Sequence, residues 1–246
     1  MKHTLEYIRE TGSTNALLKQ MIRQEAIDAM HLVYTDFQQT GRGQGDNTWE
    51  SEKGKNLLFS IYLPRPQLPI EEQFLISCIS SLALIAALRQ AVGDSLSKED
   101  FSIKWPNDIY WQEKKIGGML IENTWQGRAI SHSVIGVGIN VNQQQFYSSA
   151  PNPVSLRQLT GKRFARKKLL KEIIQAFKHY LQQDTDTIRS AYHQELFRKD
   201  GFHLYSYGKE QFQARIIEVE SDGRIMLESS SGLRTGYYFK EVMFVI

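Results

Sequence analysis

The stretch from Gln38 to Trp49 reads QQTGRGQGDNTW and is the most unusual segment of the chain. Its three glycines let the backbone approach a ligand closely, and Arg42 adds a fixed positive charge. The spacing matches neither the phosphate-binding loop G-x4-G-K-[ST] nor the dinucleotide fingerprint G-x-G-x-x-G. One interpretation is a mobile surface loop. The length, roughly 16 residues between two expected strands, instead favours a lid over a ligand site.

A second unusual segment, Lys104-Trp105-Pro106-Asn107-Asp108, closes an apolar run that we predict to be a strand. Pro106 fixes a turn, and the two residues after it can hydrogen-bond to their own backbone. Taken alone, Lys104 is an ordinary surface lysine at the end of a strand. Beside a lid that carries Arg42, it instead indicates a two-cation site for a reaction that involves anions.

The remaining patterns mix strands and helices without strict alternation, which favours an α+β fold over a doubly wound sheet. Predicted strands cover residues 3–8, 32–37, 56–63, 101–105, 117–125 and 129–141, the last two as a hairpin. Predicted helices begin after Ser13-Thr14-Asn15 and cover 73–92, 155–159 and 167–197. Short strands at 214–219, 224–227 and 233–245 predict a small β-barrel, with Tyr237, Tyr238 and Phe239 in its core.

Composition sets the class of protein. The chain has 246 residues, of which 41% are hydrophobic and 23% charged, as in ordinary globular domains. The only cysteine, Cys78, cannot form an internal disulfide, so the fold suits a reducing compartment. We interpret Cys78 as a core residue. The first ten residues contain no apolar run, so we expect no secretory signal and a cytoplasmic protein.

Charge and hydropathy limit the kinds of partner that the chain can bind. Residues 73–88 form the longest uncharged stretch, but 16 residues are fewer than the roughly 20 that span a membrane, so we predict a buried helix. A net charge of +3 suits an anionic small ligand or an acidic protein and is too small to indicate DNA binding. The six histidines show no metal-ligand spacing, so we predict no metal site. Segment 162–171 holds six basic residues and is either a solvated helix start or a docking surface.

Seven blocks, in order, resemble the biotin protein ligases, the biotin–[acetyl-CoA-carboxylase] ligase family. Together they run from the N-terminal helix start to the end of the predicted hairpin. The blocks are Ser13-Thr14-Asn15, Gln38 to Gly43, Trp49-Glu50-Ser51, Gly54 to Leu57, Lys104 to Asp108, Lys115 to Glu122, and Gly136 to Asn142.

The resemblance implies a mixed-sheet catalytic domain of the biotin/lipoate ligase type at residues 1–203 and an SH3-like barrel at 204–246. It also implies a two-step reaction, in which biotin and MgATP give biotinyl-5′-AMP and pyrophosphate. The biotinyl group then passes to one lysine of a biotin carboxyl carrier domain, such as that of acetyl-CoA carboxylase. If segment 162–171 is a docking surface and not a solvated helix start, the carrier domain would be its partner.

The resemblance also implies roles for individual residues, with Lys104 and Arg42 as the catalytic cations. Ser13, Thr14 and Gln38 would bind the ureido head of biotin, and the backbone of Gly117, Gly118, Gly136 and Gly138 would line its valeryl tail. Contacts to biotin are implied for Ser13, Thr14, Asn15, Gln38, Gly41, Arg42, Gly43, Gln44, Lys104, Gly118 and Gly138. Contacts to ATP or the adenylate are implied for Arg42, Trp49, Lys104 and Asn140.

The sequence departs from the family in two places. Many members carry a more arginine-rich loop, whereas Gln44 and Asn47 stand here, which predicts weaker retention of the adenylate unless Lys55 or Arg42 compensates. Regulatory members also carry an N-terminal DNA-binding domain. The ligase pattern here begins within the first ten residues, so we expect no DNA binding. Exposed strand edges allow either a monomer or a homodimer.

Two other functions compete with this interpretation. A lipoate or octanoyl ligase shares the fold, but lipoate has no ureido head for Ser13 and Gln38 to bind. A non-catalytic biotin-binding or DNA-regulatory module is the other alternative. The set of cationic and lid residues argues against a non-catalytic biotin-binding module. The expected lack of a DNA-binding domain argues against a DNA-regulatory module.

Overall fold

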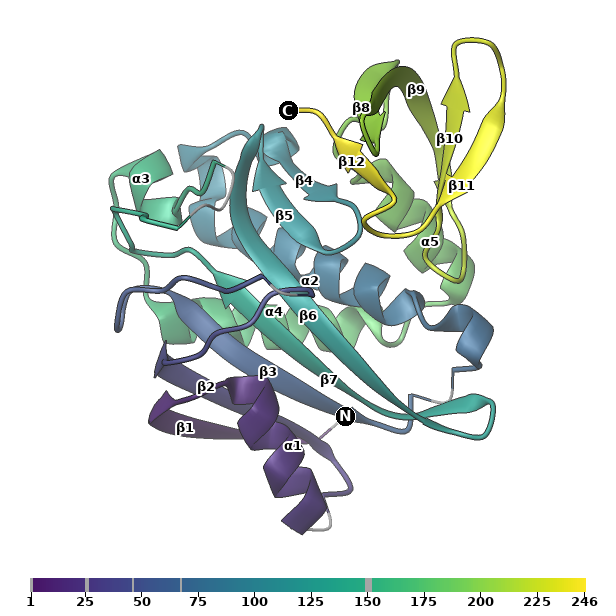
Figure 1. Ribbon diagram of the computed structural model, residues 1–246. Helices are drawn as coiled ribbons and strands as arrows, with labels where there is room; N and C mark the ends of the chain where they lie inside the picture. The colour runs from purple at the N-terminus through teal and green to yellow at the C-terminus, as the bar shows by residue number, and fades with distance from the viewer. Residues whose placement is uncertain (1, 25–26, 46, 67, 149–151) are drawn as a thin grey trace.

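A seven-stranded mixed sheet forms the centre of the protein in the computed structural model, which describes residues 2–24, 27–45, 47–66, 68–148 and 152–246 (Figure 1). Its strands lie in the order β1-β2-β3-β7-β6-β5-β4. The β1–β2 pair is parallel, and every other neighbouring pair is antiparallel. The strands are β1 (His3–Thr11), β2 (Met30–Gln38), β3 (Leu57–Pro64), β4 (Phe101–Lys104), β5 (Asp108–Trp111), β6 (Lys114–Gln126) and β7 (Ala129–Ile139).

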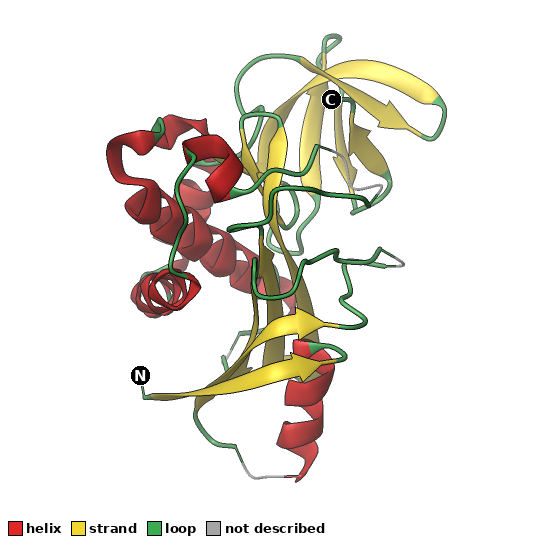
Figure 2. Ribbon diagram, turned by 90° about the vertical axis from the view of Figure 1, so that its left-hand side faces the viewer, coloured by secondary structure: helices red, strands yellow, loops and turns green. Residues whose placement is uncertain are grey.

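Helices cover the two faces of the sheet unequally. Figure 2 shows α2 (Leu75–Val92) and α4 (Arg166–Tyr180) on one side and α1 (Thr14–Gln24) on the other, where loops meet the rest of the face. Helix α2 is long and apolar enough to cross a membrane, but 72% of its apolar window is buried inside the fold, and Cys78 belongs to the core. The prediction of a buried helix here is confirmed. The shorter helices are α3 (Leu156–Thr160), α5 (Thr185–Gln194), η1 (Ile70–Glu72), η2 (Gly93–Ser95) and η3 (Lys98–Asp100).

A second, five-stranded antiparallel sheet follows, in the order β11-β10-β9-β8-β12, as expected for an SH3-like barrel. It begins at His203, one residue before the domain boundary that the sequence suggested, and treating it as a separate domain remains a proposal. The Trp105 indole N–H ties it to the first sheet by donating to the Gly223 carbonyl oxygen at 2.9 Å. The strands are β8 (His203–Tyr207), β9 (Glu210–Val219), β10 (Ile225–Ser229), β11 (Arg234–Tyr237) and β12 (Val242–Phe244).

Two sequence predictions were wrong in detail, and one strand was missed. The single helix expected at 167–197 is two helices, because Asp184 caps a new helix by accepting from the Thr187 N–H at 2.9 Å. The strand expected at 233–245 is broken between β11 and β12 by residues 238–241. Strand β5 was not predicted, because it is only four residues long and starts inside the turn that follows Pro106.

Ser155 fixes the connection between the sheet and helix α3. Its hydroxyl oxygen accepts from the Gln158 N–H at 3.2 Å and donates to the Gln143 carbonyl oxygen at 2.5 Å. The Gln158 side chain accepts in return from the Ser155 N–H, which completes a capping box. One buried hydroxyl therefore starts the helix and also holds the chain that leaves β7.

We predict that Ser155→Ala lowers the free energy of unfolding by about 1–3 kcal/mol, because it removes a helix cap and leaves a buried carbonyl unpaired. Denaturant unfolding measures this change. Ser97→Ala is the matched control, since exposed Ser97 precedes η3 and makes no side-chain cap. Equal stability of the two variants would contradict the assignment.

Candidate active site

Glycines in the paired strands β6 and β7 form the floor of the site. Gly118 and Gly138 lie opposite each other in the ladder, and the Trp49 indole rests on both. A Cβ atom at Gly138 would lie 2.7 Å from Trp49 Cζ2, closer than real contacts allow. Gly136 is covered in the same way by the side-chain amide of Asn15. Side chains from outside the sheet can therefore lie directly on its backbone only because these positions lack a Cβ.

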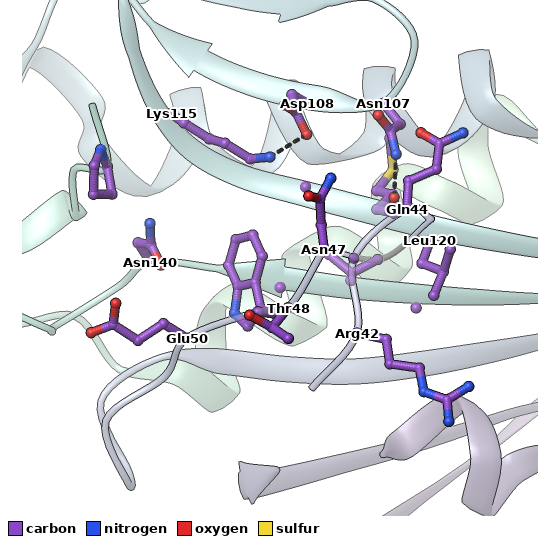
Figure 3. Close-up of a pocket in the computed structure, with 18 of the residues that line it drawn as sticks. Arg42, Gln44, Asn47, Thr48, Glu50, Asn107, Asp108, Lys115, Leu120 and Asn140 are labelled. Carbon is purple, nitrogen blue, oxygen red and sulfur yellow. Dashed lines mark hydrogen bonds and ion pairs between the residues drawn. The ribbon is translucent and has the colours of Figure 1, made fainter. Parts of the chain in front are cut away.

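A cavity of about 260 Å³ opens above this floor (Figure 3). Of the residues that the resemblance assigned to ligands, all except Gly41 and Gly117 line it. Gly41 is buried and instead closes the loop, because its carbonyl oxygen accepts from the Trp49 N–H at 3.0 Å. Gly117 lies one residue before Gly118 in β6 and therefore faces the other side of the sheet. Asp46, within the loop, lies outside the described residues.

Neutral polar groups form one end of the cavity. Gln38 Oε1 accepts from the Thr14 N–H at 2.7 Å and from the Thr14 hydroxyl at 2.9 Å. The Ser60 hydroxyl lies 2.7 Å from Thr14 Oγ1 and 2.6 Å from Asn15 Oδ1. Asn15 also donates to Glu122 at 2.8 Å. Ser13, Thr14 and Asn15 are buried where β1 turns into α1, so this end presents hydrogen-bonding groups at fixed positions.

Sequence reasoning missed Ser60 and Glu122. Ser60 is the only small polar side chain in the run LLFSIYL of β3, and that residue among large apolar and aromatic ones was the available signal. Glu122 pairs with Lys19 of α1 as well as with Asn15, across more than one hundred residues of sequence. No local pattern in the sequence connects these segments.

Lys104 lies at the end of β4, on the opposite wall of the cavity. Its ammonium nitrogen is 5.5 Å from the centre of the Tyr110 ring and 5.1 Å from that of Phe244, at distances typical of cation–π contacts. Burial lowers the pKa of Lys104, and the nearby Asp108 carboxylate partly opposes this shift. The sheet and the barrel thus hold a partly desolvated cation between them.

Arg42 lines the cavity as well, but its guanidinium points away from Asn140 (Figure 3) and also borders a second hollow beside α1. Lys55, which the sequence suggested as a compensating cation, pairs with Glu52 at 3.5 Å and does not line the cavity. A different lysine, Lys115, lines the cavity. Lys115 forms an ion pair with Asp108 at 2.6 Å, and its ammonium lies 5.9 Å from the Trp49 ring centre.

Glu50 ties together the loops at the far end of the cavity. Its carboxylate accepts from the backbone N–H of Tyr147 at 3.0 Å, from that of Ser148 at 2.6 Å, and from the Gln143 amide at 3.1 Å. Burial opposes ionisation of Glu50, but these hydrogen bonds outweigh it and hold its pKa below the ordinary value. The segment after Trp49 and the segment after β7 are therefore joined through one carboxylate.

Two polar atoms in the site are buried and have no hydrogen-bond partner among the described residues: Trp49 Nε1 and Gln44 Oε1. Because buried polar atoms are rarely left unpaired, these two mark hydrogen-bonding capacity that the described residues leave unused. Phe239 lines the cavity from the barrel side, which corrects its interpretation as barrel core. It lies in the break between β11 and β12, where its ring packs 6.3 Å from that of Trp105.

Comparison with known proteins places this geometry in a family. The Biotin/lipoate A/B protein ligase family model matches residues 7–140, more than half of the chain. Bifunctional ligase/repressor BirA of Bacillus subtilis is 26% identical over 215 residues, which cover 84% of this chain and 64% of that protein. The chain therefore spans just under two thirds of the length of that relative. Biotin–protein ligase 2 of Arabidopsis thaliana is 40% identical over 115 residues, which cover 46% of this chain and 34% of that protein.

Solved structures share the fold. Biotin protein ligase from Aquifex aeolicus, in complex with biotin and ATP, has a TM-score of 0.79 at 22% identity, covering 98% of this chain and 99% of that one. The Leishmania major biotin protein ligase, in complex with biotinyl-5-AMP, has a TM-score of 0.66 at 23% identity, covering 96% and 98%. At these identities the structural likeness shows the fold alone. The family model, in contrast, matches the amino-acid sequence. The chain belongs to the biotin/lipoate A/B protein ligase family.

Proposed function

We propose that the protein is a biotin–protein ligase that activates biotin with MgATP to biotinyl-5′-AMP and transfers the biotinyl group to a lysine of a biotin carboxyl carrier domain. The observation that carries the proposal is the arrangement within one cavity of a neutral hydrogen-bonding end, a glycine floor and a cationic wall. The names of the relatives support the same activity, since one is called biotin–[acetyl-CoA-carboxylase] ligase in Mycobacterium tuberculosis.

The neutral end suits the ureido head of biotin, which is polar but uncharged. Thr14 and Gln38 offer hydroxyl and amide groups, which the buried Ser60 hydroxyl behind them helps to hold in position. A dry pocket must satisfy the ureido in this way to bind it. The dithiolane ring of lipoate has no comparable donors and acceptors. This end of the cavity therefore favours biotin over the lipoate alternative.

The cationic wall suits the first chemical step. The biotin carboxylate attacks the α-phosphorus of ATP, a new oxygen–phosphorus bond forms, and the bond to pyrophosphate breaks. Because two anions must meet, Lys104 and Arg42 lower the barrier by neutralising charge at the point of contact. In the second step the acceptor amine attacks the acyl carbon and AMP leaves. A closed loop over the adenylate protects it from water until that amine arrives.

Magnesium would enter with the nucleotide. Among the described residues, no group of three or more His, Cys, Asp or Glu side chains could hold a metal ion. The phosphates would supply most of its ligands, with Asp108 as a carboxylate of this chain that faces the cavity. When bound, the ion neutralises phosphate charge. The carrier-domain partner, the expected lack of DNA binding, the cytoplasmic location and the oligomeric state stay predictions.

We predict that the purified protein attaches labelled biotin to a carrier domain only when ATP is present. Octanoate and lipoate should be transferred at least about a hundredfold less efficiently, because a pocket built to hydrogen-bond the ureido rejects ligands that lack it. Covalent label on the denatured carrier measures both reactions. Equal or better transfer of octanoate would favour the lipoate-type alternative, and biotin binding without adenylate formation would favour a non-catalytic module.

We also predict that Lys104→Gln slows adenylate formation by about 10²–10³-fold, because it removes a cation at the reacting phosphate. The pKa of Lys104 is lowered and its charged form is the active one, so the wild-type rate should fall as pH rises through that lowered value, earlier than for an ordinary lysine. Biotin-dependent ATP–pyrophosphate exchange across pH measures this. Lys104→Arg, which stays charged, should lose that alkaline limb; if it keeps the limb unchanged, the assignment is wrong.

A further inference from the structure

The hydrogen bonds at the neutral end of the cavity lead to a carboxylate that lies outside it. Asn15 lines the cavity and rests on the backbone of β7 at Gly136. Its amide nitrogen donates to Glu122 Oε2 at 2.8 Å and to the Leu120 carbonyl oxygen at 3.2 Å. Glu122 lies two residues further along β6, on the same face of the sheet, but it borders the hollow beside α1 instead of the cavity. Glu122 therefore contacts the cavity only through Asn15.

The two acceptors decide which way the Asn15 amide faces. An ionised carboxylate and a carbonyl oxygen can only accept hydrogen bonds, so the amide nitrogen of Asn15 must face them and its oxygen must face the other way. On that other side, the Ser60 hydroxyl oxygen lies 2.6 Å from Asn15 Oδ1. Because an amide oxygen has no hydrogen to donate, the single hydroxyl hydrogen of Ser60 points to Asn15. Glu122 thus sets the direction of a hydrogen bond that it does not itself make.

The network that continues from Ser60 has more contacts between oxygen atoms than hydrogens to fill them. Ser60 Oγ lies 2.6 Å from Asn15 Oδ1 and 2.7 Å from Thr14 Oγ1. Thr14 Oγ1 lies 2.9 Å from Gln38 Oε1. These three contacts share the two hydroxyl hydrogens of Ser60 and Thr14, because the amide oxygens carry none. Both hydrogens are used inside the network, so its oxygen atoms face a ligand as acceptors.

Lys19 holds the Glu122 carboxylate from helix α1. Its ammonium pairs with Glu122 Oε1, so one carboxylate divides its two oxygens between Lys19 and Asn15. The two charged side chains are 36% and 35% exposed, whereas Asn15 is only 6% exposed. An ion pair that is open to solvent adds little stability, but a hydrogen bond from a buried amide to a charged acceptor is strong. The contact with Asn15 is therefore the one that bears on the cavity.

We propose that Glu122 is a positioning residue for biotin, which acts through Asn15 and Ser60 to fix the neutral end of the cavity as a set of acceptors for ligand N–H groups. This inference rests on the proposed ligase function and adds a determinant of specificity that does not touch the substrate. Without the carboxylate, only the Leu120 carbonyl oxygen would hold the Asn15 amide in its orientation. If that amide turned over, the Ser60 hydrogen would point to Thr14 and the end would lose its fixed direction.

We predict that Glu122→Met weakens biotin binding by about tenfold or more, as expected for the loss of a hydrogen bond to a charged group. The KM for ATP should stay within about twofold, because the cationic wall and Trp49 are untouched. Glu122→Gln keeps an oxygen acceptor for Asn15 without the charge, so its biotin Kd should stay within about threefold of the wild type. Calorimetry measures the biotin Kd, and ATP–pyrophosphate exchange at saturating biotin measures the KM for ATP.

Two control variants separate this role from a structural one. Lys19→Met removes the same ion pair but leaves the acceptor for Asn15, so the biotin Kd should change by less than about threefold. Glu10 accepts in the same way from an amide and an ammonium, those of Gln39 at 3.0 Å and Lys53 at 2.7 Å, but it lies outside the cavity. Glu10→Met should therefore leave the biotin Kd unchanged. Thermal unfolding checks the fold of each variant.

An unchanged biotin Kd in Glu122→Met would overturn the inference. An equal loss in Lys19→Met would also overturn it, because the ion pair would then be the cause, and an equal rise in the KM for ATP would indicate a structural role. If Glu122→Met does not fold, Asn15→Asp decides, because it keeps the size of the side chain but turns the donor into an acceptor that faces Glu122. That variant should bind biotin about tenfold more weakly or worse, and wild-type affinity would contradict the inference. Failure of the wild type to form adenylate would instead reject the ligase function itself.

Discussion

The close approach of side chains to bare backbone at the centre of the sheet is the constraint on which the site depends. Gly118 and Gly138 pair across β6 and β7. If either residue carried a Cβ atom, the Trp49 indole could not lie where it does. The same holds for Asn15 on Gly136. A flat surface in the middle of a pleated sheet is thereby created, and segments that are distant in the sequence converge on it.

The rest of the fold keeps that surface open and then encloses it. Helices α2 and α4 pack on the opposite face, so the hydrophobic core lies away from the glycine floor (Figure 2). Helix α1 covers only part of the near face and delivers its polar start to the cavity. The barrel contributes Phe239 and the ring of Phe244 beside Lys104, so both sheets build the cationic wall.

Local sequence signals predicted much of this arrangement, because glycines, turn residues and helix caps act over a few neighbours. Lys104 and the buried helix α2 were singled out in this way, whereas Gln38 and Asn140 were given roles only through the family resemblance. Ser60 and Lys115 were not assigned a role, for different reasons. Ser60 reaches Thr14 only through the pairing of distant segments. Lys115 begins one of the seven family blocks, but it turns toward the cavity only because of a β-bulge in β6. The division between α4 and α5 was missed because one cap at Asp184 outweighs a continuous helical pattern.

The most direct measurement of the central claim is a crystal structure of the protein with biotin and a non-hydrolysable ATP analogue. The account predicts the ureido head at the Thr14–Gln38 end, the carboxylate beside Lys104, and the nucleotide against Trp49. All three should lie over the floor formed by Gly118 and Gly138. Electron density for either ligand at a different surface, with this cavity still empty at saturating concentrations, would contradict it.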